Sequence, residues 1–167
     1  MSESSLRLRW DDNKRLTAGK IRTRSTQMPL FEGEIDDIKG AAWLTPPEIL
    51  NPLNDEFHFD FDACPYPRPA GLDNLREEWG KVSWMNPPVG KGHSIAAWVN
   101  KAVAENDKGK TVVMLLPFER WFRKLVVRNP EFRFPGPIHF MMSNGGRAKN
   151  EGGGRIPDII VILRPRP

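Results

Sequence analysis

The chain has 167 residues, one domain of ordinary size that can bury about two-thirds of the surface its unfolded chain exposes. Its single cysteine, Cys64, excludes an internal disulfide framework, and the lack of an apolar run of ~18 residues excludes a membrane helix, so we expect a cytoplasmic protein. The net charge of +4 permits a polyanionic partner, while the three histidines lack metal-ligand spacing and predict no metal site.

The N-terminal segment is basic and lacks a sustained apolar period. Residues 1–30 carry seven Lys and Arg against three acidic residues, residues 31–119 carry eight against fifteen, and residues 120–167 carry ten against three. Basic ends attract nucleic acid in a salt-dependent way, although a disordered arm and an ordinary solvated surface also fit this composition. We expect residues 1–30 to form a flexible arm and residues 31–167 to form the domain.

The first predicted elements are a helix and a strand. Prolines favour the first turn of a helix, so residues 46–50 predict a helix start with Thr45 as its N-cap. Residues 57–62 alternate apolar and polar side chains, which predicts a strand with both aspartates on one face and the phenylalanines on the other.

The later elements alternate between strands and a helix. Residues 82–85 predict a short strand, residues 94–106 an amphipathic helix, and residues 111–116 a buried parallel strand because they form a β-branched apolar run. Residues 138–142 and 159–163 predict a C-terminal strand pair. This order predicts an α/β fold with a three-layer sheet.

The tripeptide Asn86-Pro87-Pro88 follows the strand at 82–85 and carries the strongest chemical signal. The two prolines remove two backbone donors, so the turn presents carbonyl acceptors beside the Asn86 side-chain oxygen. An adenine N6 amine is a poor nucleophile, and two acceptors on its hydrogens favour a tetrahedral nitrogen whose lone pair can attack a sulfonium methyl group. The tripeptide by itself also fits a helix start, since Asn caps helices and proline favours their first turn.

Two carboxylates lie near the end of the predicted strand at 57–62. Ligands of open α/β sheets bind beyond the carboxyl ends of the strands, so Asp60, Asp62 and Asn86 are expected to face one crevice. The carboxylates could bind Mg²⁺, or the ammonium and hydroxyl groups of a cofactor. A turn cap and a solvated side chain are the simpler alternative.

The order of the motifs closely resembles the phage-type DNA N-6-adenine methyltransferase family over about residues 41–163. The motifs are Trp43-Leu44-Thr45-Pro46-Pro47-Glu48, Phe59-Asp60-Phe61-Asp62-Ala63-Cys64, Leu72-Asp73-Asn74-Leu75 with Trp79, the Asn-Pro-Pro turn, Ile95-Ala96-Ala97-Trp98-Val99, and Val112-Val113-Met114-Leu115-Leu116-Pro117 followed by Trp121-Phe122. The resemblance implies a Rossmann-like class I methyltransferase fold. It implies methyl transfer from S-adenosylmethionine to an adenine flipped out of duplex DNA, in a phage or prophage protein that protects DNA from restriction.

The resemblance also assigns roles to individual residues. It implies that the catalytic turn is Asn86, Pro87, Pro88 and Val89. It implies cofactor contacts at Thr45, Pro46, Asp60, Asp62, Ala63 and Asp73. The basic residues that follow the Leu-Leu-Pro segment are the candidate DNA contacts, namely Arg120, Arg123, Lys124 and Arg128.

Val89 departs from the family pattern, which has Tyr, Phe or Trp after the two prolines to stack on the extruded base. Tyr66, Phe118 and Trp121 are the rings that could replace it. A catalytically inactive DNA-binding or regulatory protein on the same scaffold is therefore the alternative function. Cytosine N4 or RNA as the target would need little change in the turn.

Overall fold

The computed structural model of the chain describes residues 43–88, 94–119, 121–142 and 157–166. The predicted arm at residues 1–30 and two predicted site residues, Val89 and Arg120, lie outside these ranges.

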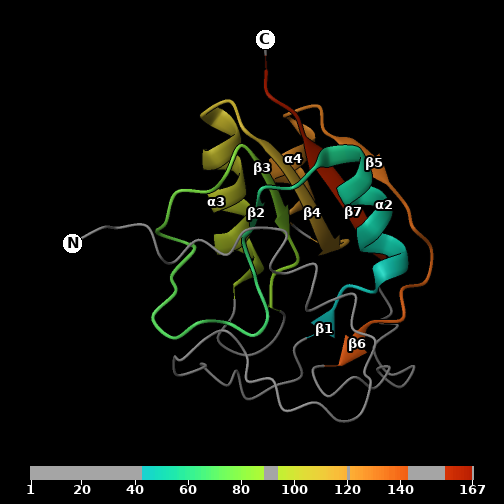
Figure 1. The fold of residues 1–167 in the computed structure, drawn as a ribbon. Helices are drawn as coiled ribbons and strands as arrows, with labels where there is room; N and C mark the ends of the chain where they lie inside the picture. Colours follow the sequence, from blue (N-terminus) through green and yellow to red (C-terminus); the bar gives the residue numbers. More distant parts are fainter. Residues whose placement is uncertain (1–42, 89–93, 120, 143–156, 167) are drawn as a thin grey trace.

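Five strands form one mixed sheet in the order β2-β3-β4-β7-β5 (Figure 1). The strands are β2 Phe61–Asp62, β3 Val82–Met85, β4 Thr111–Pro117, β5 Glu131–Arg133 and β7 Asp158–Leu163. β2, β3 and β4 are parallel to one another, whereas β7 is antiparallel to both β4 and β5. The three parallel strands therefore end at one side of the sheet, which we call the carboxyl edge.

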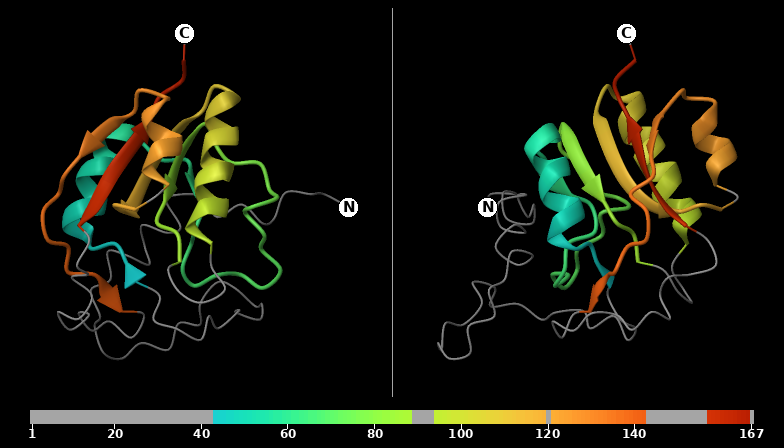
Figure 2. Two further views of the ribbon diagram at one scale, coloured as in Figure 1. Left: turned by 180° about the vertical axis from the view of Figure 1, so that it is seen from behind. Right: turned by 90° about the vertical axis from the view of Figure 1, so that its right-hand side faces the viewer.

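Helices cover both faces of this sheet (Figure 2). α2 Pro47–Phe57 packs on one face, and α3 Ile95–Asp107 and α4 Phe122–Val126 pack on the other. β4 contributes to both cores, with Val113 in the cluster under α2 and Met114 in the cluster under α3 and α4. The predicted α/β sheet is thus confirmed, with its helices in two layers.

A two-stranded antiparallel sheet lies toward the carboxyl edge, where the arrowheads of β3 and β4 point in Figure 1. It consists of β1 Trp43–Leu44 and β6 Met141–Met142. The predicted pairing of residues 138–142 with 159–163 is therefore wrong, because β7 pairs with β4 and β5 instead. Pro135 and Pro137 carry no backbone donor, and the chain leaves the main sheet at this point.

The predicted strand at 57–62 is mostly not a strand. α2 continues to Phe57, and His58 follows with a left-handed φ of 52°, which turns the chain toward β2. Without a regular pleat between them, Phe59 packs under α2 and Phe61 packs under α3. The prediction that the phenylalanines share one face is therefore wrong.

The other predicted elements are confirmed within a residue or two. α3 corresponds to the helix at 94–106, and the Ser94 Oγ caps it by accepting from the Ala97 N–H at 3.3 Å. β3 and β4 match the predicted strands, and α2 begins where the prolines indicate, although its N-cap is Pro46 rather than Thr45. Among the described helices, none is long and apolar enough to cross a membrane.

Candidate functional site

Asn86 follows β3 at the carboxyl edge, and its side-chain amide is held in one orientation. The Asn86 Nδ2 donates to the Trp43 backbone oxygen at 2.9 Å and to the Thr45 Oγ1 at 3.0 Å. These two bonds use both amide hydrogens, which assigns Oδ1 as the remaining acceptor. The side chain therefore offers an acceptor to a group that approaches the carboxyl edge.

The two prolines extend this acceptor surface. Pro87 is buried and Pro88 is half-buried, and residues 86–88 belong to neither a helix nor a strand. Because α3 starts only at Ile95, with Ser94 as its cap, the interpretation of Asn86 as a helix cap is wrong. The turn keeps its carbonyl oxygens without the two N–H groups that other residues would add.

Asp62 ends β2 on the same face of the sheet as Asn86. It pairs in register with Trp84, so its side chain projects toward the α2 side of the sheet. Asn86 follows β3, and its bonds to Trp43 and Thr45 direct its side chain toward the segment that leads into α2. Asp62 is only 4% exposed, and its Oδ1 accepts from the Cys64 N–H at 2.9 Å. Burial raises the pKa of Asp62 to about 7, and the Cys64 hydrogen bond opposes this shift only in part.

The raised pKa of Asp62 gives a testable stability effect. Since the folded pKa of about 7 lies above the ordinary 3.8, the contribution of Asp62 to stability is full below about pH 4 and is lost as the pH rises through 7. The Asp62→Asn side chain stays neutral and should not show this loss. In urea unfolding at about pH 5 and about pH 8, the parent should lose stability relative to the variant at the higher pH. A stability difference that is equal at both pH values would contradict this assignment.

A hollow of about 30 Å³ lies between the end of β2 and the Asn-Pro-Pro turn. Its lining includes Ala63, Cys64, Leu72, Asn74, Pro88 and Trp98. The walls are mainly apolar, although Arg68 also lines the hollow, and the volume is enough for about two water molecules. The hollow is thus lined both by Ala63, which the resemblance assigns to the cofactor, and by Pro88, which it assigns to the target base.

The model of the DNA N-6-adenine-methyltransferase (Dam) family matches residues 33–167. The chain belongs to this family. The matched region contains Asn86, Asp62 and the hollow, and it confirms the resemblance that the motif order indicates. Among curated proteins and among solved structures, no match was found. Membership of the Dam family indicates a DNA adenine methyltransferase.

Asp60 lies near the N-terminal ends of β2 and β3, away from the Asn-Pro-Pro turn. It precedes β2, and its carboxylate accepts from the Lys81 N–H at 3.0 Å and the Val82 N–H at 2.9 Å. Gly80 permits this contact, because a Cβ there would overlap the Asp60 carboxylate. The four residues of β3 separate Val82 from Asn86 by roughly 13 Å. The expectation that Asp60 faces one crevice together with Asp62 and Asn86 is therefore wrong.

Asn74 is a buried polar residue at the candidate site that the sequence motifs do not single out. Its Nδ2 donates to the Ala63 backbone oxygen at 2.9 Å, whereas the neighbouring Asp73 accepts from the Leu75 N–H at 3.3 Å and pairs with Arg76 at 3.2 Å. Asn74 is 5% exposed and lines the hollow; Asp73 does not line it. The motif at residues 72–75 was the available signal, but it does not reveal which polar side chain points inward.

The described candidate DNA contacts lie in two places: Arg123 and Lys124 are on α4, whereas Arg128 lies beyond its end. Arg123 and Lys124 are exposed on this five-residue helix, and the Lys124 Nζ donates to the Asn100 Oδ1 at 2.7 Å. Arg128 instead pairs with Asp107 at the end of α3, where its Nη2 lies 3.0 Å from Oδ2. α3 ends where the parallel strands begin, so Arg128 lies away from the carboxyl edge.

Proposed function

We propose that this Dam family protein is an S-adenosylmethionine-dependent DNA adenine N6-methyltransferase with a Rossmann-like class I methyltransferase fold. The observation that carries the proposal is the fixed Asn86 amide, whose hydrogens are both engaged and whose Oδ1 is left to accept. An oriented acceptor beside two prolines suits an exocyclic amine. It offers no donor to a carbonyl at the same position.

Asn86 and the prolines would act on the target amine. The Asn86 Oδ1 and a backbone oxygen of the turn would each accept one N6 hydrogen, which concentrates the nitrogen lone pair on the side that faces the methyl donor. S-adenosylmethionine supplies an electrophilic methyl group when it is bound. The chain holds the amine in line with that group, and the extra proton of the methylated nitrogen leaves to water.

The proposed cofactor end of the site is the C-terminal end of β2, with the Asp62 side chain toward α2 and the hollow on the α3 side of the same strand end. Asp62 ends β2, and a cofactor ammonium bound there would stabilise the ionised form of the carboxylate, which burial disfavours in the free protein. Ala63 and the Thr45-Pro46 segment are the other proposed contacts on this side. Because the hollow measures only about 30 Å³, it would receive a small part of the cofactor, with the rest along the carboxyl edge.

Phe118 is the proposed stacking ring for the extruded base. Trp121 is 5% exposed and lies within the core, whereas Phe118 is 42% exposed and directly follows β4. The Phe118 N–H donates to the Pro157 oxygen at 3.0 Å, and its ring lies 4.8 Å from that of Phe122. Phe118 is thus an exposed ring at the C-terminal end of β4, supported by Phe122, and it would take the place of the aromatic residue that Val89 replaces.

Phe118→Leu should reduce methylation of duplex DNA by about ten- to a hundredfold, since stacking on an aromatic ring is worth ~1–3 kcal/mol per base. The loss should be smaller on single-stranded DNA, where extrusion costs less. Phe118→Tyr retains the ring and should restore most of the activity. Labelled methyl transfer to matched duplex and single strands measures both effects. Equal rates for the parent and Phe118→Leu would remove this assignment.

The proposed DNA surface uses Arg123 and Lys124 rather than Arg128, whose charge is already paired with Asp107. The remaining expectations, a phage or prophage origin, residence in the host cytoplasm and protection from restriction, accompany the proposed activity. A catalytically inactive DNA-binding protein on this scaffold is the alternative.

Calorimetry with S-adenosylmethionine and transfer of labelled methyl groups to oligonucleotides test the proposal. We expect cofactor binding and labelling of DNA that contains adenine, with N6-methyladenine as the product. Methyl labelling found only on cytosine, or only in RNA, would show that the substrate is not adenine in DNA. A protein that binds DNA but not the cofactor would favour the inactive scaffold.

A further inference from the structure

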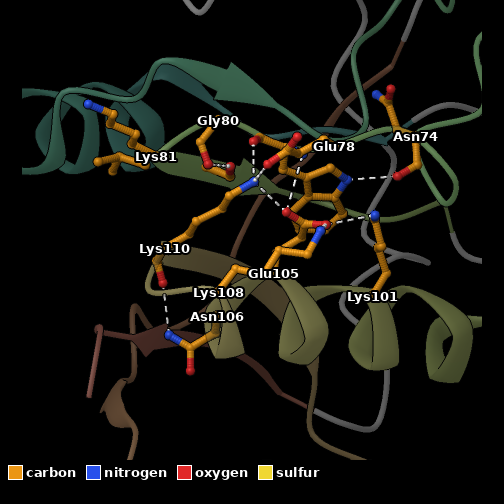
Figure 3. A network of polar contacts seen from close by, with 12 residues as sticks. Asn74, Glu78, Gly80, Lys81, Lys101, Glu105, Asn106, Lys108 and Lys110 are labelled. Atoms are coloured by element: carbon orange, nitrogen blue, oxygen red, sulfur yellow. Dashed lines mark hydrogen bonds and ion pairs between the residues drawn. The ribbon is translucent and has the colours of Figure 1, made fainter. Parts of the chain in front are cut away.

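Glu105 is a fully buried carboxylate at the centre of a cluster of lysines (Figure 3). The Lys101 Nζ and the Lys108 Nζ lie 2.8 and 2.9 Å from its Oε1, and the Lys110 Nζ lies 2.6 Å from its Oε2. Burial alone would raise the pKa of Glu105, but the hydrogen bonds from Lys101, Lys110 and Lys108 outweigh it and lower the pKa to about 2. The carboxylate is therefore a charged, fixed anchor on α3.

This anchor holds both backbone polar groups of Trp79. The Trp79 N–H donates to the Glu105 Oε2 at 3.3 Å, and the Trp79 oxygen accepts from the Lys110 Nζ at 2.6 Å. The Trp79 side chain is 1% exposed, and its ring stacks on Phe61 with centroids 6.2 Å apart. The backbone bonds to Glu105 and Lys110 and the stacking on Phe61 thus fix the position of the Trp79 indole.

The indole in turn connects Trp79 to the hollow. Its Nε1 donates to the Asn74 backbone oxygen at 2.7 Å, and the Asn74 Nδ2 donates to the Ala63 oxygen at 2.9 Å. Asn74 and Ala63 both line the hollow, and Ala63 adjoins Asp62. The segment between β2 and β3 contains no helix, so these bonds replace regular backbone pairing as its support.

We propose that Trp79 and Asn74 are positioning residues for the cofactor site. Glu105 and Lys110 hold Trp79, the indole N–H holds Asn74, and the Asn74 amide holds the end of β2 beside Asp62. The inference rests on the proposed function, since it assigns the hollow and Asp62 to the cofactor. It predicts that loss of one N–H group, remote from the target turn, weakens cofactor binding without affecting DNA binding.

Trp79→Phe tests the inference, because it removes the indole N–H and keeps an aromatic ring. Trp121→Phe is the matched control: Trp121 is also buried in the core, and its Nε1 has no hydrogen-bond partner among the described residues. Calorimetry with S-adenosylmethionine should give a dissociation constant about five- to tenfold higher for Trp79→Phe than for Trp121→Phe, as expected for one lost hydrogen bond. The KM for the cofactor should rise similarly, while kcat at saturating cofactor and the Kd for DNA should stay near parental values.

Asn74→Ala gives a second test that leaves the indole in place. It removes the bond to Ala63, and it should raise the cofactor Kd by a similar factor. If Trp79→Phe does not fold, this variant decides the question against the same Trp121→Phe control. Variants that bind S-adenosylmethionine as tightly as the control overturn the positioning role alone. A parent protein that does not bind S-adenosylmethionine overturns the proposed function, and the positioning role with it.

Discussion

Asn86→Ala should lower kcat for methyl transfer to adenine by about a hundred- to a thousandfold and should leave the cofactor dissociation constant near the parental value. Removal of one preorganised hydrogen-bonding group at the reacting atom typically has an effect of this size. The cofactor would be held at the end of β2 by other residues, so the loss should appear in the chemical step. Single-turnover transfer of labelled methyl groups, with calorimetry on the same preparations, measures both quantities.

Thr45→Val tests the role of the Asn86 amide with a smaller change. It keeps the size of the side chain but removes the hydroxyl that accepts from the Asn86 Nδ2 at 3.0 Å, while the bond to the Trp43 oxygen remains. The amide would be held less firmly, so kcat should fall by less than in Asn86→Ala. Because Thr45 is also a proposed cofactor contact, its effect on cofactor binding is measured separately. Full activity of Asn86→Ala would refute the assigned role of the turn.

The sequence was most informative where local physics decides the structure. The apolar run at β4 and the amphipathic period of α3 predict their elements because one periodic face must be buried. The Asn-Pro-Pro turn is informative for a different reason, since two prolines limit the backbone whatever surrounds them. These elements also place Asn86 at the carboxyl edge without knowledge of tertiary contacts.

The sequence was misleading where tertiary contacts decide the structure. Residues 57–62 alternate as a strand does, yet α2 takes Phe57 and the left-handed His58 breaks the pleat. Asp60 and Asp62 look equivalent in the sequence, but one binds the backbone at the start of β3 and the other is buried at the end of β2. The partner of β7 was missed for a similar reason, because β5 is short and close to prolines.

Glu105 was missed although its sequence carries a signal. Lys101 and Lys108 lie four residues before and three residues after it, the spacing at which helical side chains meet. Such pairs usually occur on solvated faces, and the burial of Glu105 arises from Lys110 and Trp79 on neighbouring segments. Only the packed structure distinguishes this anchor from an ordinary surface pair.

Glu105→Gln should lower the free energy of unfolding by about 3–5 kcal/mol, because it removes the buried counter-charge of Lys101 and Lys108 and leaves Lys110 paired with the exposed Glu78. The side chains of Lys101 and Lys110 are only 13% and 11% exposed, so water cannot fully replace the lost carboxylate. Glutamine preserves the size of the side chain and an oxygen that can still accept from the Trp79 N–H. The loss of unfolding free energy therefore reflects mainly the removal of the Glu105 charge. Urea unfolding at neutral pH measures it.

Glu78→Gln is the matched control for this prediction. Glu78 also pairs with Lys110, at 3.0 Å, but its side chain is 60% exposed, and its replacement should change stability little. The pH dependence gives a second check. Since the folded pKa of Glu105 is lowered from 4.5 to about 2, its stabilisation is fully present above about pH 4.5 and is lost as the pH falls toward 2. The stability difference between the parent and Glu105→Gln should therefore shrink in acid, and a difference that persists at about pH 2 would show that packing, rather than charge, makes Glu105 important.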